Sequence, residues 1–587
     1  MTLPADKIPS SQMNKPTLLA APALILITPL VTFLRHHGYD LLAAEAILCI
    51  AALAAIGLAI GAFMAMRPHV LGPIVLCIMT IPWTLEPAAA AIAFAVDAVL
   101  GHAGAATSGS PSAARLTYGA IGLVALGLFA LFWMARRSVG VIAATVFGVM
   151  LIVAALSTSG RHVKSVAVHS GPPPLRADLP PVVHLVLDEH IGVAGIPEDV
   201  PGGRTLKRDI VAFYERHGFR LYSHAFSHYW TTTDSLSNLL NGTASARFFM
   251  QVDRDNTQRL SVNRWFHALR ERGYQIEVHQ TDHLDFCAAG GVEICSTYLA
   301  NSIAALRHET RVGPVTAALA IIYGHLSRSR HYRVVGVAYE GALRTPAAFV
   351  GVELPGWKWE RLVVGPLLAS RAVDDLASAI RRTPNGRAFF AHVMLPHNSY
   401  MFDRACGIEA NALRWSDRGS SLRRPLAPND AGDRAARYGR YLEQVACTYR
   451  FIDKVLQALG DTGALDRAVV LIHGDHGSRI GIRDPLASWT DRVSQRDILD
   501  FYSTLYAIRA PGVEPGIVNE IVSIQALFAD QMLKDRASPR SNRVYLPPVD
   551  AKPLAPLSTR SIIFESDAAG AATAEAFDPR RAVGHGR

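Results

Sequence analysis

Two stretches of the sequence decide the fold: VVHLVLDEH at residues 182–190 and VVLIHGDHG at residues 469–477. Each begins as an apolar run with the length of a buried strand and ends in acidic and imidazole side chains. In open α/β sheets, ligands bind just beyond the carboxyl ends of the strands. We therefore expect Asp188, Asp475 and His476 to converge there on one cation.

Around these stretches, expected strands alternate with expected helices. The strands are 182–187, 219–223, 275–279, 388–395, 467–473 and 502–508, and the helices are 204–217, 232–241, 262–272 and 436–459. Such alternation predicts a mainly parallel sheet with helices on both faces. The stretch 300–385 gives no clear pattern.

The first 157 residues are of a different class, because the apolar excess of the chain is concentrated there. Candidate membrane spans are 17–35, 41–65, 71–100, 116–135 and 138–157, each long enough for the ~20 apolar residues that cross a bilayer. Polar residues and a proline interrupt the third. We predict a transmembrane domain of about five spans (1–157), a proline-rich linker (158–181), an exported α/β catalytic domain (182–545) and a disordered tail (546–587).

Basic residues indicate the topology of these spans. Lys7 and Lys15 precede the first span, Arg67 follows the second, and Arg136 lies between the fourth and fifth, while the loop 101–114 has no lysine or arginine. By the positive-inside rule, the amino terminus is cytoplasmic and five spans place residues 158–587 outside. The expected location is the inner cell membrane, multi-pass, with the catalytic domain on the periplasmic side.

Cysteine usage agrees with an exported domain. Cys49 and Cys77 fall inside expected spans, and four cysteines remain in the soluble part: Cys287, Cys295, Cys406 and Cys447. An even set in an exported domain predicts two disulfides, most simply Cys287–Cys295 and Cys406–Cys447 among three possible connectivities. Four reduced thiols are the alternative.

The net charge of +9 and the pI near 9.3 do not predict a nucleic-acid-binding protein. The basic residues are scattered and are not interleaved with aromatic residues. A basic exported domain beside a membrane fits anionic lipid headgroups instead.

A third motif, YWTTTDSL at residues 229–236, precedes an apolar helical pattern that ends at Gly242. Hydroxyl groups at a helix amino terminus are normally caps. The same position offers free backbone N–H groups to a phosphate or sulfate. A threonine beside a metal ion there can become a nucleophile.

Together these three motifs resemble the sulfatase-like branch of the alkaline phosphatase superfamily, over residues 181–530. Sulfatases of that branch carry Cys-x-Pro-Ser-Arg with a glycine ten places after the cysteine. Counting back from Gly242 places Thr232 at the nucleophile, Ser235 at the motif serine and Leu236 where sulfatases have arginine. An unmodified threonine is similar instead to lipid A phosphoethanolamine transferases, and loosely to lipoteichoic acid synthases, which also place about five membrane helices before an exported domain.

The resemblance implies a two-step transfer of a phosphoryl headgroup, of the phosphoethanolamine or glycerol phosphate type. Thr232 would take it from a membrane phospholipid and pass it to an envelope glycan or lipid. One divalent ion, zinc or manganese with calcium or magnesium as alternatives, would be bound by Asp188, Asp475 and His476, with Thr232 and Glu189 as further ligands. These residue types suit such ions.

In the resembling families, a histidine after the strand expected at 388–395 contacts the phosphate or sulfate, which makes His397 a candidate for substrate binding or general acid catalysis. Ser235, Arg479 and His283 are further candidates for substrate contact. A sulfuric-ester or phosphodiester hydrolase of the same fold is the alternative function. A catalytically silent envelope scaffold is a second alternative.

Overall fold

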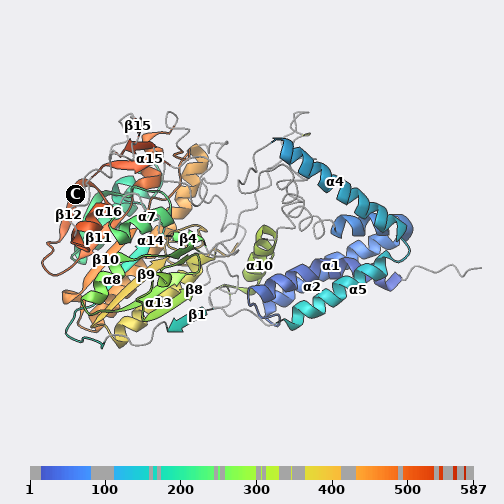
Figure 1. Ribbon diagram of the computed structural model, residues 1–587, viewed down its shortest axis with the longest axis horizontal. Coiled ribbons are helices and arrows are strands. Elements are labelled where there is room, and N and C mark those ends of the chain that lie inside the picture. The colour runs from blue at the N-terminus through green and yellow to red at the C-terminus, as the bar shows by residue number, and fades with distance from the viewer. Residues whose placement is uncertain are drawn as a thin grey trace, which may run out of the picture. The chain divides into compact units, whose positions relative to one another are not determined.

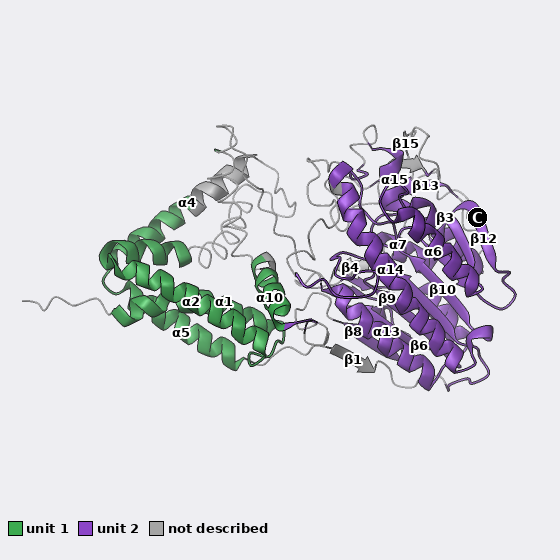
Figure 2. Cartoon of the chain, turned by 180° about the vertical axis from the view of Figure 1, so that it is seen from behind, with its two compact units in different colours: residues 1–160, 314–362 green, residues 161–313, 363–587 purple. Residues whose placement is uncertain are grey.

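The structure is a computed structural model in which the chain forms two compact units (Figures 1 and 2). Unit 1 comprises residues 1–160 and 314–362, and unit 2 comprises residues 161–313 and 363–587. The residues that the structure describes are 15–80, 111–157, 163–167, 174–243, 249–251, 258–298, 306, 312–328, 346, 364–411, 431–486, 493–534, 541–546, 560–564 and 574–576.

Unit 1 is built from apolar helices. Helix α1 (Lys15–His36) packs against α2 (Ala44–Ala65) and α5 (Val139–Leu156), and α10 (Pro314–Arg328) contacts α2; α4 (Pro111–Met134) precedes α5 in the chain. Gly57 and Gly61 of α2 face the backbone of α1 so closely that a Cβ atom at either glycine would overlap it. Small residues at such a contact let two apolar helices pack backbone to backbone, as membrane helices do.

Three helices of unit 1 are long and apolar enough to cross a membrane: α1, α2 and α5. They correspond to the first, second and fifth expected spans. The described part of the third expected span forms a shorter apolar helix, Pro68–Thr80, and residues 81–100 lie outside the described residues. The fourth falls on α4, in which residues Gly122–Met134 form a shorter apolar helix. Of the five expected membrane spans, the structure therefore supports three, the first, the second and the fifth.

Unit 2 contains a nine-stranded, mainly parallel sheet in the order β1-β8-β6-β9-β2-β10-β11-β3-β12. The strands are β1 (Val163–Ala167), β2 (Val182–Leu187), β3 (Arg220–Phe226), β6 (Gln275–Thr281), β8 (Ile294–Tyr298), β9 (Arg387–Val393), β10 (Val469–Gly474), β11 (Tyr506–Arg509) and β12 (Gly516–Ser523). Antiparallel pairing involves β1 and β11. The predicted mainly parallel sheet is confirmed.

Helices pack on this sheet (Figure 1). They are α6 (Gly203–Arg216), α7 (Thr232–Asn241), α8 (Arg264–Glu271), α13 (Gly365–Arg382), α14 (Ala431–Asp461), α15 (Gln495–Tyr502) and α16 (Ile524–Gln531). Two small sheets accompany them, β4 (Phe249–Gln251), β5 (Gln258–Leu260) and β7 (Leu284–Asp285), and β13 (Arg543–Tyr545), β14 (Arg560–Ile563) and β15 (Ala574–Ala576). The last two of these strands lie in the range expected to be a tail, and Phe564 stacks on Phe226.

The centre of the sheet positions the site. Strands β9, β2 and β10 are adjacent and parallel, and their registers pair Leu187 with both Val393 and Gly474. All six residues of β2 are buried, as expected for a strand covered on both faces. The three strands therefore end at the same level, and the segments beginning at Asp188, Met394 and Asp475 leave the sheet side by side.

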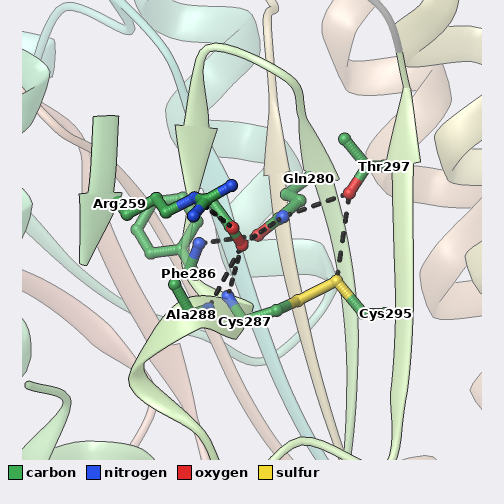
Figure 3. Close-up of a disulfide and its surroundings, with 8 residues drawn as sticks. Arg259, Gln280, Phe286, Cys287, Ala288, Cys295 and Thr297 are labelled. Carbon is green, nitrogen blue, oxygen red and sulfur yellow. Dashed lines mark hydrogen bonds and ion pairs between the residues drawn. A yellow bond between two sulfur atoms is a disulfide. The ribbon is translucent and has the colours of Figure 1, made fainter. Parts of the chain in front are cut away.

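Both expected disulfides are present, Cys287–Cys295 and Cys406–Cys447. Figure 3 shows the first, which joins the segment after β7 to strand β8 near Gln280 and Thr297. The second joins the segment after β9 to helix α14. Cys49 and Cys77 of unit 1 are buried and free.

The two disulfides should differ in how much they stabilise the fold, because the second closes the longer loop. Their sequence separations are 8 and 41 residues, which corresponds to roughly 2.5 and about 4 kcal/mol in the loop-entropy estimate. In denaturant unfolding, the double variant Cys406→Ala/Cys447→Ala should therefore lose more free energy of unfolding than the double variant Cys287→Ala/Cys295→Ala. The reverse order would contradict this assignment.

Candidate active site

The site forms where three neighbouring strands end. Residues 188–191 follow β2, residues 394–402 follow β9, and residues 475–481 follow β10. A fourth segment, the amino terminus of α7, brings Thr232. The residues predicted from distant parts of the sequence therefore do meet at the carboxyl edge of the sheet.

Asp188, Asp475 and His476 form a compact group of potential metal ligands. One ligand atom from each lies within 4.8 Å of the others, and all three residues are buried. Asp188 Oδ1 and Asp475 Oδ2 have no hydrogen-bond partner in the described part of the chain. Two carboxylates buried side by side with unbonded oxygen atoms are unfavourable without a cation. Their donor set fits a divalent ion.

The pKa shifts of the two carboxyl groups reflect this crowding. Burial raises the pKa of Asp475, and the charge of Asp188 raises it further. Burial also acts to raise the pKa of Asp188, but His397, His392 and His476 outweigh it, so that the pKa lies below its usual value. The pair thus holds at least one negative charge that a cation would balance.

Among the described residues, a second group with metal-ligand types is Asp285, Cys287 and Cys295. The two cysteines are bonded to each other, so no thiolate is available there. Asp285 instead accepts hydrogen bonds from Gln280 Nε2 and from the backbone N–H groups of Cys287 and Ala288. These contacts assign this group to the structure of the loop.

Thr232 is the first residue of α7, and its hydroxyl is directed to the metal-ligand group. Its Oγ1 lies 3.3 Å from His476 Nε2. The preceding residue, Thr231, is the N-cap, and it makes no capping hydrogen bond to the helix backbone. Thr232 therefore is not the N-cap residue of α7, and helix capping does not explain the presence of a hydroxyl at this position.

Ser235, expected to contact substrate, has a different environment. It is fully buried, and its hydroxyl donates to the backbone carbonyl of Asp475 at 2.6 Å. Ser227 Oγ lies 2.9 Å away and Gln525 Nε2 donates to Ser235 Oγ at 3.2 Å. Ser235 thus holds the segment that carries Asp475 against α7, and its hydroxyl is engaged inside the protein.

Glu189, Arg479 and His397 form a second polar group beside the first. The Glu189 carboxylate accepts from Arg479 Nε at 2.6 Å and lies 3.5 Å from His397 Nε2. Arg479 Nη2 lies 3.2 Å from the same His397 nitrogen. Glu189 is not part of the metal-ligand group, because its carboxylate is directed to Arg479; its backbone N–H donates to Asp475 Oδ1 at 3.0 Å.

Two other histidines lie near these groups. His392 lies within strand β9 and approaches Asp188 Oδ2 with its Nε2 at 3.3 Å, so it orients the carboxylate. His283 is half-buried, and burial lowers its pKa, with further electrostatic influence from Asp188 and His397. Its side chain is therefore within electrostatic range of the site.

The sequence interpretation missed the contribution of α14. Tyr441 and Gln444, both fully buried, contact the segments that follow β2 and β9. Their spacing of three residues, with Tyr438 three residues earlier, places them on one helix face. Polar residues recurring at this spacing within an otherwise apolar face were the available indication.

Asp475→Asn should separate the cost of charge burial from metal binding. In chelator-treated protein, the substitution should stabilise the fold by about 1–3 kcal/mol, because it removes one of two facing buried charges. The pKa of Asp475 is raised in the folded state. The stability gain from Asp475→Asn should therefore be absent below the pKa of an aspartate in the unfolded chain, about 3.9. It should grow as the pH rises from there through the pKa of Asp475 in the folded protein.

Thermal unfolding with chelator, zinc or manganese measures both effects. The wild type should gain stability from the ion and Asp475→Asn should gain little. Asp285→Asn, at the disulfide, is the matched control and should respond to the ion like the wild type. An Asp475→Asn protein that gains as much as the wild type would remove Asp475 from the metal site.

Comparisons with known proteins identified a family model and several solved structures that are similar to this chain. A sulfatase family model matches residues 212–495. One similar solved structure is a phosphonate monoester hydrolase of Agrobacterium radiobacter, with 12% identity over 68% of this chain and 90% of that chain and a TM-score of 0.39. Another is a phosphonate monoester hydrolase from Silicibacter pomeroyi, with 16% identity over 68% of this chain and 89% of that chain and a TM-score of 0.37. A third is a putative sulfatase from Bacteroides fragilis (13%, 64% and 77%, 0.35).

A search of curated proteins found no match. The region matched by the family model includes Thr232, His397, Asp475 and His476, and the sheet that positions these residues is the predicted one. The match to the sulfatase family model therefore extends over these site residues and over just under half of the chain.

Proposed function

We propose that the protein is a membrane-anchored, metal-dependent phosphotransferase that moves a phospholipid headgroup to an envelope acceptor through a phosphothreonine. The observation that carries this proposal is the position of the Thr232 hydroxyl at a helix amino terminus, 3.3 Å from His476 and beside the two buried carboxylates. A hydroxyl needs no modification to attack phosphorus. The motif offers neither cysteine nor proline to the machinery that makes formylglycine in sulfatases.

In the first step, Thr232 Oγ1 forms a bond to phosphorus while the bond between phosphorus and the diacylglycerol oxygen breaks. The threonine loses its proton and diacylglycerol leaves with one. In the second step, the acceptor hydroxyl displaces Thr232 from phosphorus and the threonine is protonated again. The two steps transfer the headgroup phosphate without net oxidation or reduction.

Asp188, Asp475 and His476 would hold the divalent ion. When bound, such an ion lowers the pKa of a neighbouring hydroxyl and balances the negative charge of the phosphoryl group. Thr232 is the first residue of α7, and the free backbone N–H groups at a helix amino terminus favour an anion. His397, which lies beside Arg479, would contact a phosphate oxygen or deliver a proton to the leaving oxygen.

Membrane anchoring supports a lipid substrate. Helices α1, α2 and α5 are each long and apolar enough to span a bilayer, and the two disulfides of unit 2 fit an oxidising compartment such as the periplasm. We propose the inner membrane as the location and a membrane phospholipid as donor. The acceptor would be a hydroxyl of an envelope glycan or lipid.

A hydrolase of the same fold is the second candidate, and the sulfatase family match is equally compatible with it. Water would then replace the acceptor hydroxyl in the second step. The first step and its residues are common to both functions, so the products distinguish them.

Thr232→Ala tests the proposal. The full-length protein would be assayed in vesicles that contain phosphatidylethanolamine or phosphatidylglycerol with labelled headgroups. The substitution should lower diacylglycerol release by about a thousandfold or more and abolish labelled protein. It removes the nucleophile but no core packing, so the unfolding temperature should stay close to that of the wild type.

Thr233→Ala, the same change one position along α7, is the matched control and should retain release and labelling. If Thr232→Ala behaved like Thr233→Ala, the phosphothreonine route would be excluded. Labelled free headgroup phosphate in place of labelled acceptor would favour the hydrolase.

A further inference from the structure

Helix α14 (Ala431–Asp461) contributes no residue to the metal-ligand group, yet three of its side chains contact all three segments that leave the sheet at the site. Tyr438, Tyr441 and Gln444 are each fully buried and occur at intervals of three residues, so they lie on one face of the helix. A helix face in a core is normally apolar. Three buried polar side chains there require a reason.

Tyr441 holds the segment after β2. Its hydroxyl donates to the backbone carbonyl of Glu189 at 2.7 Å and accepts from the N–H of Ile191 at 2.9 Å. Glu189 has a φ of 63°, a left-handed conformation that is unfavourable for a residue with a Cβ atom. The single hydroxyl thus bridges both sides of a strained turn and fixes the direction in which the Glu189 side chain leaves the backbone.

Gln444 holds the segment after β9. Its Oε1 accepts from the N–H groups of Met401 and Phe402 at 2.8 and 3.2 Å. Its Nε2 donates to the carbonyls of Pro396 and His397 at 3.1 and 2.8 Å. Only an amide side chain supplies donors and an acceptor in this arrangement. One helical turn later, Cys447 bonds to Cys406, beyond the same segment.

Tyr438 holds the segment after β10. Its hydroxyl lies 2.7 Å from Ser478 Oγ and 2.6 Å from Asp500 Oδ1. Asp500 is in turn bound by Arg434 through two hydrogen bonds, and the backbone N–H of Arg479 donates to the Asp500 carbonyl. The neighbour of Ser478 is Arg479, the cation of the second polar group.

The side chains whose backbones are held in this way meet each other. Glu189, His397 and Arg479 come from three separate segments, and each contacts the other two. Small shifts of any one segment would break these contacts, because side-chain hydrogen bonds tolerate only a few tenths of an ångström. Helix α14 contacts all three segments.

We propose that Tyr441 and Gln444 are positioning residues for the transfer step, which act through Glu189 and His397. The inference rests on the proposed function, since it assigns these residues to the same site. It goes beyond packing, because packing alone would need neither the hydroxyl of Tyr441 nor the amide of Gln444.

Tyr441→Phe is the first test, because it removes one hydroxyl and keeps the ring. The full-length protein would be assayed in the same labelled vesicles, with metal content and unfolding temperature measured on each sample. We expect formation of labelled protein to slow by about 10- to 100-fold, with KM changed by less than about twofold and metal content unchanged. The matched control is Tyr506→Phe, also fully buried, whose hydroxyl bonds Gln531 and none of the three segments.

If Tyr441 had only a structural role, both tyrosine variants would lose stability. At temperatures where they are folded, both would then form labelled protein at the wild-type rate. That result would overturn the inference. A loss of metal in Tyr441→Phe would overturn it as well, because the effect would then act through the ligand group.

Gln444→Met tests the route through His397, because methionine keeps the volume and removes both hydrogen-bonding functions. Alone, it should slow labelling at least tenfold. In a His397→Ala background it should slow labelling by less than about twofold further, because the residue through which it acts is already absent. Gln531→Met, which removes another amide that bonds two side chains, should be additive with His397→Ala.

Full additivity of Gln444→Met and His397→Ala would overturn the inference. Failure of the inference about α14 is distinguishable from failure of the proposed function. In the first case, the wild type still shows turnover that depends on Thr232, and the α14 variants behave like their controls. In the second case, the wild type shows no turnover that Thr232→Ala removes, and the inference falls with the function.

Discussion

The structure of unit 2 depends on two carboxylates that are buried side by side at the edge of a parallel sheet. Asp188 and Asp475 follow adjacent strands whose registers end together, so the sheet itself forces their proximity. Like charges at such a distance are unfavourable in a poorly solvated interior. A divalent cation would resolve the conflict, and one oxygen atom of each residue without a hydrogen-bond partner in the described part of the chain would be available to it.

The other groups of the site surround this pair in a consistent way. Ser235 fixes the backbone of Asp475 to α7, which places the Thr232 hydroxyl beside His476. Three separate segments bring Glu189, Arg479 and His397 together on another side. A buried polar arrangement of this kind is stable only when its members are satisfied, and the polar face of α14 supplies hydrogen bonds to each segment. The chemistry of the site and its rigidity therefore come from different elements.

Much of this could be predicted from the sequence because the relevant patterns are local. The expected strands 182–187 and 467–473 correspond to the central strands β2 and β10, and the expected helix 232–241 matched α7. The roles of Ser235 and Glu189 could not be predicted in the same way. Each depends on which partner the fold brings near, the Asp475 carbonyl in one case and the Arg479 guanidinium in the other. The role of the polar face of α14 could not be predicted either, because its hydrogen bonds reach segments up to 252 residues away in the sequence.

The most direct test of one shared cation is anomalous diffraction from crystals of the full-length protein grown with zinc or manganese. We predict a single strong peak within bonding distance of Asp188, Asp475 and His476, with the hydroxyl of Thr232 turned toward it. A peak at another place, or a Thr232 hydroxyl directed away from a correctly placed ion, would contradict the assignment of this site as a metal-dependent transfer centre.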